Sequence, residues 1–170
     1  MTHFLKKETY ILFIVFLVIL FVSQHTFASG KIITDQITST ALAGNKLGDS
    51  NVRNVVIYLP SSYVSSDKSY PIIYLLHGFG GNARSFVDEV TEQFVVFLLD
   101  GLADAKVIKE MIIVMPDGKN KYGGSYYLNS ELIGNYEDYI SKELVNHMQT
   151  NYRVIRDRDA CVIAGASMGG

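Results

Sequence analysis

The stretch CVIAGASMGG, residues 161–170, decides how the rest of this chain is interpreted. The apolar residues Cys161 to Ala164 predict a strand, and Gly165 to Gly169 fit the pattern Gly-x-Ser-x-Gly. Directly after a strand, that pattern holds the serine in a strained turn that exposes its hydroxyl as a nucleophile. Ser167 is therefore a candidate catalytic nucleophile. The alternative is a turn of small residues that only leads into a helix.

Three other apolar runs predict strands of the same kind: Asn54 to Leu59 (NVVIYL), Pro71 to Leu76 (PIIYLL) and Met111 to Met115 (MIIVM). Continuous apolar runs are typical of strands buried on both faces, as in a parallel sheet covered by helices. The run that begins at Cys161 is expected to be buried in the same way, which makes its thiol an inert core group. Lys31 to Thr40 predicts an edge strand.

Two segments between these runs have helical spacing. Thr91 to Ala105 carries an apolar stripe at positions four residues apart, Phe94, Leu98 and Leu102, with Val95 and Leu99 beside it. Ser130 to Thr150 carries a similar stripe, which consists of Tyr136, Ile140, Leu144 and Met148. Strands that alternate with helices predict βαβ units and a three-layer α/β domain.

The second motif is HGFGG, residues 77–81, directly after the run that ends at Leu76. A glycine-rich loop exposes backbone N–H groups that can stabilise the oxyanion of an acyl-transfer transition state. Phe79 N–H is our first choice for this donor and Gly80 N–H the second, with Met168 N–H as the partner donor from the residue after the nucleophile. The alternative is a tight turn that binds no ligand.

Other polar residues are assigned structural roles. His77 is expected to brace the oxyanion loop rather than act as a general base, and His147 to be a packed or solvated helix residue. Asp117 is expected to serve a turn. The loop Lys119 to Asn129, which contains three tyrosines, lines an acyl or aromatic pocket or simply packs against its neighbours; the sequence does not separate the two.

The first 28 residues resemble a secretory signal peptide. Lys6 and Lys7 precede an apolar run from Ile11 to Val22, which is shorter than the roughly 20 residues that a membrane-spanning helix needs. Cleavage is expected after Ala28, and a permanent membrane anchor is the weaker alternative. Residues 29–170 are then the exported part, in the secreted or cell-envelope compartment, with no stable membrane span.

Composition excludes several classes of protein. The 15 basic and 17 acidic side chains give a net charge of −2 with no basic run, which argues against a nucleic-acid partner. A hydrophobic content of 48% argues against a disordered chain. The single cysteine excludes a disulfide within the chain and a multi-cysteine metal cluster. No metal or organic cofactor is implied, and the oligomeric state is open.

The motifs PIIYLLHGFGG, MIIVMPDG, YGGSYYLNS, NYEDYISKEL and AGASMGG, in this order, closely resemble the Putative esterase family of α/β-hydrolases. This family includes S-formylglutathione hydrolases, feruloyl esterases and mycolyltransferases, and the resemblance runs from about Val52 to Gly170. It implies an α/β-hydrolase fold with Ser167 as the nucleophile and the N–H groups of Phe79 and Met168 as the oxyanion hole. The implied substrate is a small-molecule or glycan-linked carboxylic ester.

The family presents its triad in the order Ser, Asp or Glu, and His, and only one residue follows Gly169. We therefore expect residues 29–170 to be the N-terminal part of the domain, truncated at the nucleophile elbow, inactive alone and poorly soluble. The main hypothesis is an exported serine esterase that forms an acyl-enzyme on Ser167. The alternatives are an acyltransferase of the same superfamily and a non-catalytic, glycan- or wall-binding truncated product.

Overall fold

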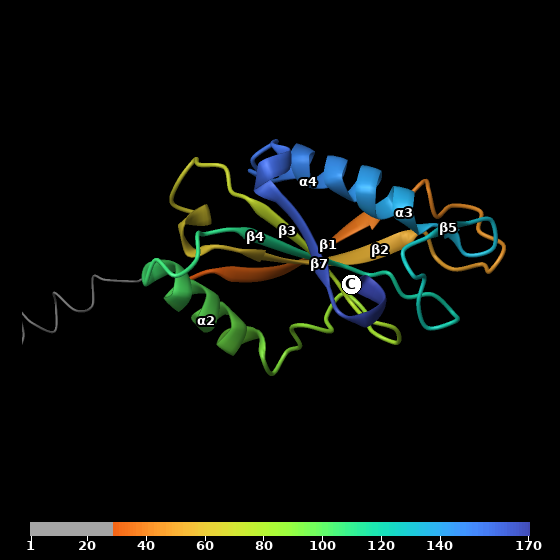
Figure 1. The fold of residues 1–170 in the computed structure, drawn as a ribbon, viewed down its shortest axis with the longest axis horizontal. Coiled ribbons are helices and arrows are strands. Elements are labelled where there is room, and N and C mark those ends of the chain that lie inside the picture. The colour runs from red at the N-terminus through yellow and green to blue at the C-terminus, as the bar shows by residue number, and fades with distance from the viewer. Residues whose placement is uncertain (1–28) are drawn as a thin grey trace, which may run out of the picture.

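The computed structural model of the protein describes residues 29–170, and the expected leader, residues 1–28, lies outside the described residues. The described part forms a five-stranded mixed sheet with helices on both faces, which confirms the three-layer α/β architecture (Figure 1). The strand order across the sheet is β1-β2-β4-β3-β7. The five strands are β1 (Lys31–Thr38), β2 (Val52–Leu59), β3 (Ile72–Leu76), β4 (Ile112–Pro116) and β7 (Cys161–Gly165).

Strand direction brings three loops to one edge of the sheet. β1 and β2 form an antiparallel pair at one side, and β2 is also antiparallel to β4. β4, β3 and β7 are parallel to one another. Because parallel strands end at the same edge of a sheet, the segments that follow β3, β4 and β7 lie together there. These segments contain the motifs that the sequence analysis singled out.

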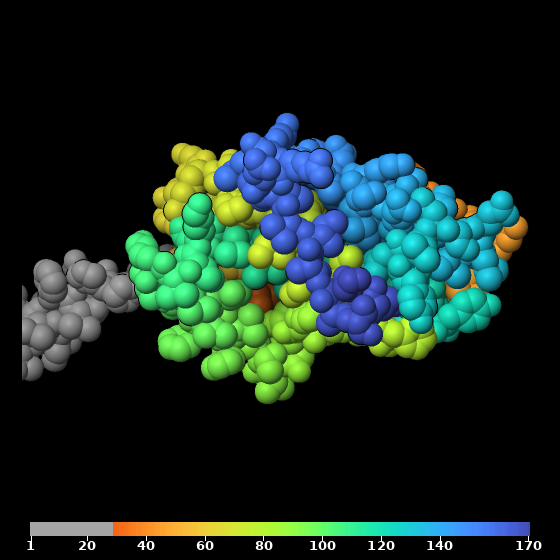
Figure 2. Space-filling model, viewed as in Figure 1, coloured from red at the N-terminus to blue at the C-terminus, as the bar shows by residue number. Residues whose placement is uncertain are grey.

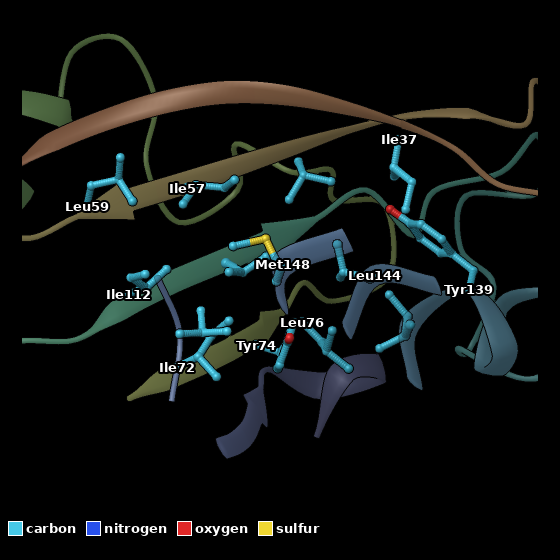
Figure 3. Close-up of a cluster of buried hydrophobic side chains, with 14 of the residues drawn as sticks. Ile37, Ile57, Leu59, Ile72, Tyr74, Leu76, Ile112, Tyr139, Leu144 and Met148 are labelled. Atoms are coloured by element: carbon cyan, nitrogen blue, oxygen red, sulfur yellow. The ribbon is translucent and has the colours of Figure 1, made fainter. Parts of the chain in front are cut away.

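One helical rod covers the first face of the sheet. Its stripe of Tyr136, Ile140, Leu144 and Met148 is buried, as predicted, against residues of the sheet. Figure 3 shows Leu144 and Met148 among these residues. The rod starts six residues later than predicted, because residues 129–135 form a two-stranded ribbon whose second strand begins at Gly134, with φ of +99°. The elements are β5 (Asn129–Ser130), β6 (Gly134–Asn135), α3 (Tyr136–Asp138), a π-helical segment (Tyr139–Leu144) and α4 (Val145–Asn151).

Helix α2 (Glu92–Asp104) lies on the other face of the sheet, close to its predicted position (Figure 1). The predicted apolar side is only partly correct: Val95 and Leu99 pack against the core beside the buried Val96, whereas Phe94 and Leu98 are exposed. The segment carries apolar residues around almost its whole circumference. Spacing alone therefore could not identify which side faces the sheet.

Strand β7 forms where predicted, but its predicted burial is wrong. All five of its residues are exposed, because β7 pairs only with β3 and no other described element covers it. Figure 2 shows this last part of the chain, in dark blue, on the surface of the molecule. Cys161 is accordingly an exposed free thiol and not a core group. Within residues 29–170, no helix has both the length and the apolar character needed to cross a bilayer.

Glu143 connects the helical rod to the loop after β1. Its carboxylate accepts hydrogen bonds from the hydroxyls of Ser39 and Thr40 and from the backbone N–H groups of Thr40, at 3.0 Å, and Ala41, at 2.9 Å. Partial burial acts to raise the pKa of Glu143, but these hydrogen bonds outweigh it and hold the pKa below its usual value. The ionised carboxylate therefore stabilises the fold.

Glu143→Gln is expected to lower the free energy of unfolding at pH 7 by about 1–2 kcal/mol, because charge-assisted bonds become neutral ones. A group whose pKa is depressed by folding stabilises the protein above its unfolded pKa, about 4.3 for Glu, and loses that effect as the pH falls through the folded value. The difference from wild type should therefore narrow below about pH 4. Urea unfolding at pH 7, 5 and 3.5 measures this, with exposed Glu137→Gln as the control. If Glu143→Gln lowered the free energy of unfolding equally at pH 7 and pH 3.5, the stabilising role of the ionised carboxylate would be contradicted.

Candidate active site

Ser167 occupies a strained turn between β7 and a single 3₁₀ turn, Ser167–Gly169. Its φ is +54°, in the left-handed region that a residue with a side chain rarely adopts. Backbone bonds hold the turn: Ala166 N–H donates to the Leu76 carbonyl at 3.1 Å, and Gly169 N–H donates to the Ala166 carbonyl at 3.0 Å. The Ser167 side chain is exposed. This is the geometry that the pattern Gly-x-Ser-x-Gly predicts for a nucleophile turn.

The two glycines of the pattern are required by close backbone contacts. A Cβ at Gly165 would lie 2.2 Å from the Gly169 carbonyl oxygen, and a Cβ at Gly169 would lie 2.3 Å from the Leu76 carbonyl oxygen. These contacts press the turn against the end of β3. The loop after β3 also lies beside the turn, since a Cβ at Gly78 would lie 3.2 Å from the Ala166 carbonyl oxygen and 3.4 Å from the Cβ of Ser167.

The glycine-rich loop and the nucleophile turn present two free donors. Among residues 29–170, neither Phe79 N–H nor Met168 N–H has a hydrogen-bond acceptor. Gly80 N–H, the second choice for the loop donor, donates to the Gly123 carbonyl at 2.8 Å, so it is not available to a ligand. The geometry therefore favours Phe79 over Gly80, and the oxyanion hole of Phe79 and Met168 stays a prediction.

His77 is almost fully buried and lies between two loops at the edge of the sheet. Its Nε2 accepts the backbone N–H of Gly118 at 2.9 Å, so the ring proton is on Nδ1, which donates to the Gly78 carbonyl at 2.8 Å. The Tyr127 hydroxyl donates to the backbone carbonyl of His77 at 3.0 Å. Both ring nitrogens are engaged, which agrees with a bracing role and leaves no nitrogen for the Ser167 proton.

The second described histidine, His147, is also engaged elsewhere. Its Nε2 lies 2.8 Å from the Asp35 carboxylate, which also accepts the hydroxyl of Tyr152 at 2.7 Å. These interactions outweigh the effect of burial and hold the pKa of Asp35 below its usual value. The pair connects α4 to β1 and is a packed helix contact, as predicted. Among residues 29–170, no three or more acidic, histidine or cysteine side chains are placed to hold a metal ion.

Asp117 serves its predicted turn by accepting the backbone N–H of Lys119 at 2.9 Å. Burial acts to raise the pKa of Asp117, but this N–H group and the positive charge of Arg53 outweigh it and hold the pKa below its usual value. Asp117 is therefore an anion at neutral pH, with its carboxylate 3.8 Å from His77 Nε2.

The tyrosine loop, residues 119–129, lies beside the glycine-rich loop and the nucleophile turn (Figure 1). Tyr122 and Tyr126 are exposed, and the ring centroid of Tyr126 lies 6.1 Å from that of the exposed Phe79. Tyr127 is half-buried, and burial raises its pKa, which keeps its hydroxyl a donor. Tyr127 therefore packs beside His77, and Tyr126 contacts Phe79; that the loop lines an acyl or aromatic pocket stays a prediction.

Two buried residues near the site carry no local sequence motif. Arg53, on β2, donates to the Lys119 carbonyl at 2.8 Å and to the Tyr136 hydroxyl at 2.6 Å. Asn120, in the tyrosine loop, accepts two backbone N–H groups of its own loop. An arginine within the apolar run of β2 was a signal that could have been followed. Asn120 had no comparable signal, since asparagine is common in loops.

Comparison with known proteins agrees with this geometry. Residues 49–170 match the family described as Putative esterase. The chain is 33% identical over 120 residues to an esterase of Mycobacterium tuberculosis, an alignment that covers 68% of this chain and 24% of the relative. It is 30% identical over 142 residues to an endo-1,4-beta-xylanase/feruloyl esterase of Xylanibacter ruminicola, which covers 79% of this chain and 18% of the relative.

Solved structures show the same fold. A ferulic acid esterase superposes with a TM-score of 0.70 at 29% identity, over 83% of this chain and 50% of the esterase. An S-formylglutathione hydrolase from Agrobacterium tumefaciens superposes with a TM-score of 0.62 at 18% identity, over 86% of this chain and 52% of the hydrolase. The chain thus spans about half the length of these structures, and less of the curated relatives.

Proposed function

This chain belongs to the Putative esterase family of α/β-hydrolases, and on that premise we propose that it is the nucleophile-bearing part of an exported serine carboxylesterase. The observation that carries the proposal is the left-handed φ of Ser167 in a turn that only glycine permits on either side. A serine held in this way is exposed for attack and has backbone N–H donors next to it.

The reaction would proceed in two steps through an acyl-enzyme. In the first step, Ser167 Oγ adds to the ester carbonyl carbon while its proton passes to a base, and the bond to the alcohol breaks as the alcohol takes up that proton. In the second step, water adds to the acyl-enzyme and releases the acid and the free serine. In both steps the carbonyl oxygen becomes an oxyanion, which Phe79 N–H and Met168 N–H would stabilise.

The base would come from outside the described residues. His77 is held by Gly78 and Gly118, and His147 is paired with Asp35, so neither can take the proton of Ser167. A serine hydroxyl without a base is a poor nucleophile near neutral pH. Residues 29–170 alone are therefore proposed to be catalytically incomplete, with a His and an Asp or Glu supplied from outside them.

Aromatic esters are the substrate class that the site supports best. Phe79 and Tyr126 expose more than half of their side chains next to the nucleophile turn, and aromatic rings at this spacing can pack against an aryl group. Relatives named ferulic acid esterase and feruloyl esterase agree with this choice. Export through the leader, residues 1–28, would place the enzyme where cell-wall esters occur.

The test compares two polypeptides. One is the 170-residue chain, and the other, the extended chain, also contains the residues encoded downstream of Gly170, as far as an acidic residue and a histidine. With 4-nitrophenyl acetate and a feruloyl ester, the short chain should be no faster than its Ser167→Ala variant. The extended chain should lose roughly 1,000-fold or more of its kcat on the same substitution. Turnover that survives Ser167→Ala would contradict the nucleophile, and Ser167-dependent turnover by the short chain would contradict the need for an outside base.

A further inference from the structure

The tyrosine loop, residues 119–129, contacts both residues that carry the predicted oxyanion donors, although it is adjacent to neither of them in the sequence. Gly80, next to Phe79, donates its N–H to the Gly123 carbonyl at 2.8 Å. On the other side of the site, Tyr126 N–H points at the sulfur of Met168, with an N···S distance of 3.3 Å. The tyrosine loop thus contacts the glycine-rich loop through one residue and the nucleophile turn through another.

Two glycines of the tyrosine loop make this contact close. A Cβ at Gly123 would lie 2.9 Å from the Phe79 ring. A Cβ at Gly124 would lie 2.5 Å from the Met168 sulfur and 3.0 Å from the Phe79 ring. The backbone of the loop therefore lies between the side chains of the two donor residues. A shift of the loop would move both donors.

Asn120 holds the loop in this position. Its Oδ1 accepts the N–H groups of Tyr122, at 2.9 Å, and Gly124, at 3.2 Å, and its own carbonyl accepts Gly123 N–H at 2.9 Å. The side chain is almost fully buried. An amide oxygen that accepts two backbone N–H groups of its own loop is typical of an asparagine that defines a loop.

We propose that Asn120 is a positioning residue for ester hydrolysis: it fixes the tyrosine loop, which in turn aligns the N–H groups of Phe79 and Met168. The role rests on the proposed function, since alignment matters only if these groups stabilise an oxyanion. Asn120 acts through the loop and touches no reacting atom. Its loss should weaken the stabilisation of the transition state more than the binding of the ester.

The first test measures amide hydrogen exchange by mass spectrometry, on the 170-residue chain and the extended chain. Asn120→Ala should speed exchange at Gly80 about tenfold or more, because the bond to the Gly123 carbonyl is lost. Asn120→Asp keeps an accepting oxygen at this position and should restore slow exchange. Asn51→Ala is the control, since Asn51 bonds only to Ser39, in the loop between β1 and β2.

The second test measures ester hydrolysis by the extended chain. Asn120→Ala should lower kcat by about 10- to 100-fold and change KM less than about threefold, with recovery in Asn120→Asp. If Asn120 had only a structural role, Asn120→Ala would lower activity by lowering the amount of folded enzyme. Asn51→Ala, compared at matched stability, would then lower activity equally. Unchanged exchange at Gly80 in Asn120→Ala, or an equal rise in the control, would overturn the proposal.

The two proposals fail separately. Hydrogen exchange requires no turnover, so the loop can be shown to hold Gly80 even if Ser167→Ala has no effect on hydrolysis. Conversely, turnover that depends on Ser167 but not on Asn120 leaves the esterase in place and removes the positioning role.

Discussion

Gly169→Ala is expected to destabilise the fold by about 3 kcal/mol or more, because overpacking against backbone cannot be relieved by a side-chain rotation. The new Cβ would lie 2.3 Å from the carbonyl oxygen and 2.7 Å from the carbonyl carbon of Leu76. Leu76 ends β3, which is paired on both sides, with β4 and β7. To relieve the contact, either the centre of the sheet or the Ser167 turn must move.

The urea midpoint of unfolding measures this effect, and Gly101→Ala is the matched control. Gly101 is an exposed residue of α2, and a Cβ there meets nothing within 4 Å. Alanine in a helix interior is favoured over glycine by about 0.5–1 kcal/mol, so this variant should be more stable than wild type. Equal midpoints for Gly169→Ala and wild type would show that the turn does not press against β3 as described.

His77→Ala is expected to cost about 3 kcal/mol, the second large effect, because it combines a cavity with an unpaired buried donor. His77 is 1% exposed, and its Nε2 is the acceptor for the N–H of Gly118, which is itself buried. Without the ring, the turn after β4 loses its connection to the glycine-rich loop. The same variant should therefore also reduce turnover by the extended chain, through misplacement of Phe79.

His77→Gln separates the two causes, since its amide oxygen can reach the position of Nε2 and accept from Gly118. His77→Gln should therefore be more stable than His77→Ala and less stable than wild type. His147→Ala removes a partly exposed pair with Asp35 and should cost about 1 kcal/mol or less. If His77→Ala proved as mild as His147→Ala, the bracing role of His77 would be wrong.

The parts of the fold that the sequence predicted well are those governed by local patterns. The strands β2, β3 and β4 lie within two residues of their predicted bounds, because β-branched apolar runs bounded by Pro60 and Pro71 allow little else. The nucleophile turn followed from its glycines in the same way. Met148 and the rest of its stripe were found because that helix is polar on its other side.

The wrong predictions depended on what lies far away in the chain. The exposed side of α2 could not be distinguished by spacing, because Phe94 and Phe97 are as apolar as Val96. The burial of β7 depends on neighbours across the sheet rather than on its own residues. Asn120 acts through the Gly123 carbonyl on Gly80, which lies in a different loop, and a single sequence does not show such a connection.

The open outer side of β7 turns Cys161 into a chemical reporter. It is the only cysteine of the chain, so alkylation by N-ethylmaleimide modifies one known position. Partial burial raises the pKa of its thiol, which slows the reaction near neutral pH and makes its rate easy to follow. Any element that packs over this face of β7 would shield the thiol, so the rate of alkylation measures, in solution and without a substrate, how completely the strand is covered.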